Sequence, residues 1–250
     1  MSPSWRRSCQ VGKLANSNWG ADPKTLKQAA LALCYSTAEY CAPVWARSCH
    51  ASKVDSELNK ACRTITGALK PTPLPALYQI ASIALPPIRR ETTTKYERDK
   101  QLSDNRHPLY GHQELRRRLK SRKSFVTTNG LGNQKPSEDR LEQWREADRL
   151  PLNESLPEPS ENLPPGSSFS RKDWIALNRA RVRVGKTGDN LAKWGLTEST
   201  ACPCGEKIQT MDHILRGCTL GPSCSNQDLL EANHAALRWI QWWRDTIWMN

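Results

Sequence analysis

The chain has 250 residues, a hydrophobic fraction of 37% and a formal net charge of +12 at pH 7. That fraction lies below the roughly 45–50% of typical globular proteins, and the 17 prolines indicate that part of the chain is not packed. Two modest cores and an unpacked connection are therefore predicted. The positive charge favours a polyanionic partner such as RNA or DNA. No stretch approaches the ~18 apolar residues of a membrane span, which excludes a membrane partner.

Residues 1–20 contain no apolar run of about seven residues or more, as an export signal would require. The nine cysteines are therefore expected to be reduced, in an intracellular protein that is nuclear or cytoplasmic. Cysteine then serves either as a small buried apolar residue or as a metal ligand.

The first part of the chain predicts helices. Asp22 and Pro23 are typical of a helix start, and apolar residues follow at helical spacing to Trp45, with a kink or an end expected at Pro43. A second helix is expected from about residue 52 to 69, and Cys34, Cys41 and Cys62 are interpreted as buried core residues of these helices. Residues 86–102 predict a long polar helix whose charges form ion pairs on a solvated face or contact phosphates; the sequence favours neither.

The run 116–123 contains six basic side chains and no acidic one, and it is the strongest local signal for nucleic acid. It also resembles a nuclear-localisation patch. The predicted phosphate contacts are Arg116, Arg117, Arg118, Lys120, Arg122 and Lys123. This run ends the first predicted region, residues 1–123.

Residues 124–169 are rich in proline and acidic side chains and predict a disordered linker, with only a hint of a short helix around Trp144. The last region, residues 170–250, opens with a capping serine, Ser170, and ends in a helix expected from about 226 to 248. Tryptophans widen the apolar stripe of that helix. The stripe is expected to be core or a protein interface, the partner then docking on Trp239, Trp242 and Trp243.

Two short motifs lie in the last region. Gly185-Lys186-Thr187 satisfies a loose phosphate-loop pattern but lacks the preceding strand and the first glycine, so no nucleotide site is predicted. Cys-x-Cys-x8-His-x4-Cys supplies three thiols and an imidazole, the donors that a structural zinc prefers, and Gly205 allows a tight turn after the second cysteine. The predicted ligands are Cys202, Cys204, His213 and Cys218, with Cys224 as a substitute. The alternative is reduced structural cysteines beside a surface histidine.

Both ends of the chain resemble one family. Residues 13–16 and 19–26 resemble the connector after the palm of non-LTR retrotransposon reverse transcriptases of the jockey-like kind, and residues 30–36, 38–45, 58–67 and 86–91 extend the similarity. Residues 194–195, 202–205, 209–210, 212–214 and Cys218 resemble the Cys-Cys-His-Cys region at the C-terminal end of those proteins. The similarity covers most of residues 11–120 and 171–220.

The predicted fold is mainly α, with a disordered acidic linker and a terminal tryptophan-rich helix. The resemblance implies that the first region is a helical thumb-like bundle and that the last contains a small zinc-knuckle-like module. Reverse transcriptases of this family hold two magnesium ions with aspartates, two of them adjacent. This chain has eleven aspartates and no two are adjacent, so no catalytic residue is assigned and no enzyme activity is expected. The expected function is that of a non-catalytic, non-sequence-specific nucleic-acid-binding fragment of an RNA-directed DNA polymerase. The alternatives are a protein-interaction module and a non-functional transposon relict.

Overall fold

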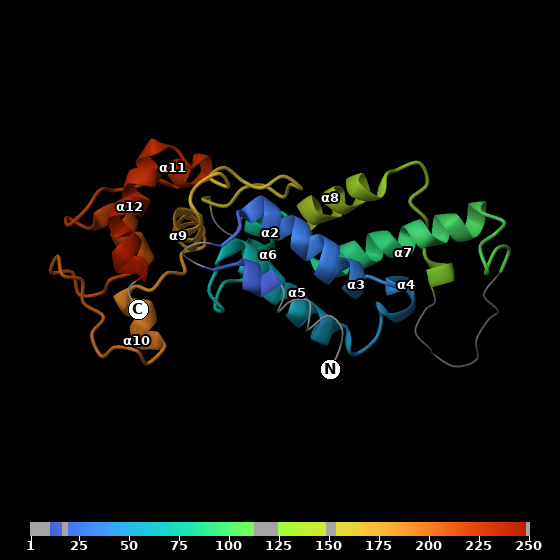
Figure 1. Ribbon diagram of the computed structural model, residues 1–250, viewed down its shortest axis with the longest axis horizontal. Coiled ribbons are helices and arrows are strands. Elements are labelled where there is room, and N and C mark those ends of the chain that lie inside the picture. Colours follow the sequence, from blue (N-terminus) through green and yellow to red (C-terminus); the bar gives the residue numbers. More distant parts are fainter. Residues whose placement is uncertain (1–10, 17–19, 113–124, 149–153, 249–250) are drawn as a thin grey trace.

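The computed structural model describes all residues except 1–10, 17–19, 113–124, 149–153 and 249–250. The described residues are mainly helical, which confirms the predicted mainly α class. Two buried apolar clusters form, one among the helices of the first half of the chain and one in the last third. Figure 1 shows helix α9 between these two parts of an elongated molecule.

Helix α2 (Pro23–Ala30) of the bundle begins where the sequence predicts. The Asp22 carboxylate accepts hydrogen bonds from the amides of Lys24 and Thr25 over 2.9 and 3.0 Å, which satisfies donors that a helix start leaves open. The helix continues through the π-helical turn η1 (Leu31–Tyr35) into α3 (Ser36–Ala38). The break comes at Cys41, not at Pro43. Cys41 has φ 52° and is exposed, so its prediction as a core residue is wrong.

Pro43 lies instead in the first turn of α4 (Ala42–Trp45), where a missing amide hydrogen costs a helix nothing. Helix α5 (Ala51–Thr66) follows and ends at Gly67, and α6 (Leu74–Ala81) packs against it. Cys34 and Cys62 are buried in the first core, as predicted.

Helix α7 (Pro86–Ser103) confirms the predicted long polar helix, but its basic side chains mostly pair with other elements. Arg89 pairs with Glu39, and Arg90 pairs with Asp55. Lys95 lies 2.7 Å from Asp139. These three ion pairs connect α7 to the rest of the bundle. The three basic side chains therefore do not form a free surface for phosphate contacts.

The range 124–169, predicted to be a disordered linker, contains a helix and a side chain of the first core, so the prediction is wrong for that part of the range. After the short turn η2 (Phe125–Thr127), residues Pro136–Ala147 form helix α8, which packs on α7. Trp144 is only 1% exposed and belongs to the first core. Its burial, together with the ion pair of Asp139, compensates for the low apolar content of the segment. Figure 1 shows α8 lying alongside α7.

Helix α9 (Arg171–Arg181) joins the two halves. Ser170 caps it, its hydroxyl accepting from the amide of Asp173, as the sequence predicts. Side chains of α9 then donate to the last carbonyls of α5: Arg171 to Ile65 over 2.6 Å, Trp174 to Ile65 over 3.1 Å, Asn178 to Thr66 over 3.0 Å and Arg179 to Gly67 over 3.1 Å. A helix C-terminus leaves such carbonyls open and carries partial negative charge, which two arginines complement.

The C-terminal part contains α10 (Gly188–Lys193), the π-helical turn η3 (His213–Gly217), α11 (Asn226–Glu231) and α12 (His234–Trp248). The single helix predicted over 226–248 is divided at Ala232, which has φ 52°. Trp239 and Trp243 are buried in the second core, so they are not available as a docking surface. Only Trp242 of the predicted interface is exposed, at 59%.

Candidate metal centre

The first two candidate ligands lie on a tight turn. The amide of Gly205 donates to the carbonyl of Cys202 over 3.0 Å, and the amide of Cys202 donates to the carbonyl of Glu206 over 2.9 Å. Gly205 has φ 100°, a backbone conformation that favours glycine, so the role predicted for this residue is confirmed. The turn directs the Cys202 and Cys204 side chains to one point although a single residue separates them.

The other two ligands lie at the ends of one π-helical turn. His213 is the first residue of η3, and Cys218 follows its last residue. Because a π-helix pairs residue i with residue i+5, the spacing His-x4-Cys brings these side chains to the same side of the backbone. The hydroxyl of Thr210 accepts from the amide of His213 over 3.1 Å and fixes the start of the turn.

The four ligand atoms of Cys202, Cys204, His213 and Cys218 lie within 4.8 Å of one another. The sulfur atoms of Cys202 and Cys218 are 3.7 Å apart, and Sγ of Cys204 lies 3.2 Å from Nε2 of His213. Zinc–sulfur bonds of 2.3 Å in a tetrahedron would separate two sulfurs by about 3.8 Å. The spacing of the cluster is therefore compatible with a metal such as zinc.

The cluster is partly buried in the second core. Cys202 and Cys218 are buried, Cys204 and His213 are half-buried, and Met211, Ile214 and Leu215 belong to the surrounding apolar cluster or adjoin it. Burial raises the pKa of Cys218 to about 11, whereas a hydrogen bond from the main chain of Glu206 lowers the pKa of Cys204. A cation would favour both thiolates by its charge.

Gln209 links the cluster to α10, a role that the sequence analysis did not assign. Its side-chain nitrogen lies 3.7 Å from Sγ of Cys202, and its side-chain oxygen accepts from the amide of Gly188 over 2.9 Å. Donors to ligand atoms orient them and tune the metal. The position of Gln209 seven residues after Cys202 carries no spacing signal, because the loop 200–209 folds back on itself before the two side chains meet.

Other predicted site residues are not in this group. Cys224 is buried, and its sulfur donates to the carbonyl of Ser225, so the structure does not bring it among the ligand atoms. The six basic residues of 116–123 lie outside the described residues. Thr187 of the loose phosphate-loop pattern is a helix cap, its hydroxyl accepting from the amide of Asn190 at the start of α10.

Comparisons of the chain with protein-family models, with curated proteins and with solved structures found no match. The family resemblance therefore rests on the residues that carry it in the sequence. In the part of the chain that the structure describes, no helix combines the length and the apolar character needed to cross a membrane.

Proposed function

We propose that the chain is a non-catalytic nucleic-acid-binding fragment of a non-LTR retrotransposon reverse transcriptase, stabilised by a structural zinc. The observation that carries the proposal is the Cys202, Cys204, His213 and Cys218 cluster, in which four ligand atoms converge. It lies in the block of sequence that resembles the C-terminal region of that family. The net charge of +12 supports a polyanionic partner.

In this proposal the four ligands hold zinc and leave it no open coordination position. Three thiolates and one imidazole form a closed tetrahedral set, which is typical of structural and not of catalytic zinc. The metal would supply folding energy to a core whose turns, Cys202–Gly205 and η3, are short. The polymerase chemistry of the family would then belong to a palm that this chain does not supply.

The nucleic-acid contacts are assigned to the basic run 116–123, since three basic residues of α7 are used in ion pairs within the bundle. Phosphate contacts release counterions and carry no sequence preference, so binding should be sensitive to salt and tolerant of sequence.

The test combines metal analysis with a binding titration. Wild-type protein purified without added metal should contain one zinc per chain, and it should bind a labelled 20-nucleotide RNA or DNA of mixed sequence at 50 mM salt. A variant with Arg116, Arg117, Arg118, Lys120, Arg122 and Lys123 changed to Gln should lose most of that affinity. The matched control changes six lysines elsewhere to Gln, at Lys13, Lys24, Lys53, Lys172, Lys193 and Lys207, and should lose less. Equal losses would refute the assignment to 116–123.

The second candidate, a protein-interaction module, has less support than the sequence indicated. Trp239 donates to the carbonyl of Ile214 over 3.2 Å and Trp243 to that of Pro222 over 3.4 Å, so both serve the core. A stable complex that is lost in Trp242→Ala, together with no nucleic-acid binding, would favour this candidate. A circular dichroism spectrum dominated by coil would favour the third, a relict that folds in part.

A further inference from the structure

A cavity of about 440 Å³ lies in the N-terminal half, away from the metal cluster. Five segments that are distant in sequence form it: α2, the η1–α3 turn, the connection between α6 and α7 with the start of α7, helix α8, and the loop that carries Glu161. The volume is within the usual range of small-molecule sites, roughly 300–1,000 Å³.

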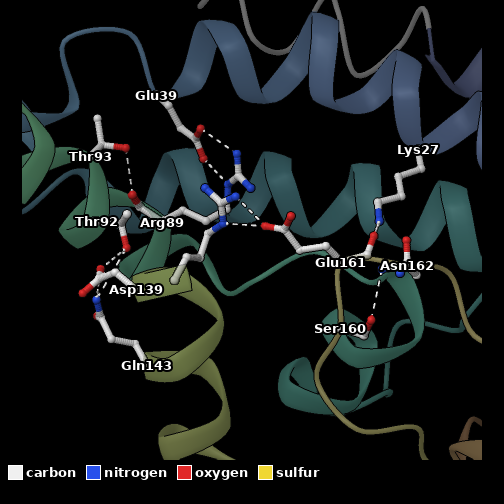
Figure 2. Close-up of polar contacts among 11 residues, drawn as sticks. Lys27, Glu39, Arg89, Thr92, Thr93, Asp139, Gln143, Ser160, Glu161 and Asn162 are labelled. Atoms are coloured by element: carbon white, nitrogen blue, oxygen red, sulfur yellow. Dashed lines mark hydrogen bonds and ion pairs between the residues drawn. The ribbon is translucent and has the colours of Figure 1, made fainter. Parts of the chain in front are cut away.

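Three cations and two carboxylates line this cavity. Arg89 is held by Glu39, with Nη2 2.9 Å from Oε2, in a two-point pair. Nε of Arg140 lies 3.1 Å from Oε1 of Glu161. Nζ of Lys27 donates to the main-chain carbonyl of Glu161 over 2.5 Å. Figure 2 shows Lys27 reaching towards the segment that carries Glu161, while Glu39 approaches Arg89 from the other side.

Glu161 is the more exposed of the two carboxylates of the cavity. Its side chain is 50% exposed, whereas that of Glu39 is 18% exposed. The main chain around it is held independently, by Lys27 and by the Ser82 hydroxyl, which donates to the carbonyl of Asn162 over 2.7 Å. Rotation of the Glu161 side chain away from Arg140 would therefore leave the backbone in place.

The net charge of the cavity without the Glu161 carboxylate indicates the kind of ligand that it would bind. With Glu161 rotated outward, Arg89 stays neutralised by Glu39, and Lys27 and Arg140 leave two positive charges uncompensated. A phosphomonoester carries about −1.5 to −2 at pH 7 and offers three strong acceptor oxygens. Leu31, Ile83 and Ala84 add an apolar wall, and the volume exceeds that of a phosphate group, so an organic part has room beside it.

We propose that this cavity binds a phosphomonoester, whose phosphate takes the place of the Glu161 carboxylate against Arg140 and also pairs with Lys27. The carboxylate of Glu161 serves as the internal competitor that fills the site in the absence of ligand. The proposal does not depend on the zinc cluster or on nucleic-acid binding.

Calorimetric titration of the full chain with ribose 5-phosphate, at constant ionic strength, tests the site. Arg140→Gln should weaken binding about tenfold, because it removes a charge-assisted hydrogen bond, and Glu161→Gln should strengthen it by a similar factor. Lys27→Gln should also weaken binding while it keeps a donor for the Glu161 carbonyl. Glu158→Gln is the matched control: this exposed residue lies on the same loop, and its change adds the same charge outside the cavity.

The proposal predicts that Glu158→Gln binds ribose 5-phosphate like the wild type and that ribose itself does not bind. Equal strengthening by Glu158→Gln and Glu161→Gln would show a general charge effect and overturn the site. Absence of binding to wild type and to Glu161→Gln would overturn it as well. Binding of inorganic phosphate without binding of ribose 5-phosphate would overturn the assignment of an organic ligand.

Discussion

The indole nitrogen of Trp174 donates to the carbonyl of Ile65 over 3.1 Å, although 109 residues separate the two in sequence. This bond joins α9 to the end of α5 and lies beside the bonds from Asn178 and Arg179 to the next two residues. The two halves of the chain are therefore connected by buried polar contacts as well as by apolar packing, and the end of α5 is a sensitive position.

Gly67 tests this junction. It has φ +70°, and a Cβ atom there would lie 2.2 Å from Cγ1 of Ile175. Gly67→Ala should lower the free energy of unfolding by about 3 kcal/mol, since it combines backbone strain with a steric overlap. Urea denaturation measures the change.

Gly132→Ala is the matched control, because Gly132 has φ +64° but no atom within 4 Å of an added Cβ. It should cost only about 1 kcal/mol, the backbone strain alone. Equal losses in the two variants would contradict close packing of α9 on the end of α5.

Trp144 tests whether α8 belongs to the bundle. The side chain is 1% exposed within the first core, so Trp144→Ala should cost about 3–5 kcal/mol through lost burial and a cavity. Thermal unfolding followed by circular dichroism measures the loss. Glu142→Ala, an exposed position on the same helix, should change stability by less than about 0.5 kcal/mol. If Trp144→Ala did not change stability, α8 would not be part of the bundle, and the segment would be the linker that its composition predicts.

Metal removal should act on the C-terminal half. We expect Cys204→Ser to lose bound zinc and to lose hydrogen-exchange protection in η3, while α5 and α6 keep theirs. Cys49→Ser, an exposed cysteine outside the cluster, should retain one zinc per chain. Mass spectrometry of the native protein and exchange at the peptide level give both readouts. Full zinc occupancy in Cys204→Ser would remove this residue from the ligand set.

The side chain of Lys27 should lose its proton at a lower pH than an ordinary lysine. Burial lowers its pKa from 10.5 to about 8, and the charge of Glu161 opposes that shift. The unfolded chain therefore binds more protons than the folded chain between pH 8 and 10.5. The free energy of unfolding should decrease as the pH falls from 10.5 to 8, because Lys27 is then protonated while it is buried. Glu161→Gln should lower the pKa further. Carbon-13 chemical shifts of the lysine side chains report it, with exposed Lys53 as the reference signal. A rise of the Lys27 pKa in Glu161→Gln would contradict the arrangement of the cavity.

Local signals in the sequence predicted local structure well. Asp22 and Ser170 cap helices, and the long helix over 86–102 forms, because caps and periodicity act over a few residues. The four residues of the cluster were predicted from their spacing together with the family resemblance, and the structure brings their ligand atoms within 4.8 Å of one another. The breaks at Cys41 and Ala232 were missed, since non-glycine residues with positive φ give no compositional signal.

Features that depend on distant residues could not be predicted. The order of α8 depends on Asp139 meeting Lys95, which lies 44 residues away in sequence. The cavity depends on Lys27 reaching the segment of Glu161, 134 residues along the chain. Each segment taken alone shows only ordinary charged residues, and only the fold places them together.

The central claim, that this chain binds nucleic acid through its positive charge, is tested most directly by the salt dependence of binding. Fluorescence anisotropy with one labelled single-stranded RNA, from 50 to 200 mM salt, gives the slope of log Kd against log salt concentration. Six phosphate contacts predict a slope near 4, at about 0.7 for each contact on a single strand, and a similar affinity for a second RNA of unrelated sequence. No measurable binding at 50 mM salt, or an affinity that does not change with salt, would contradict the claim.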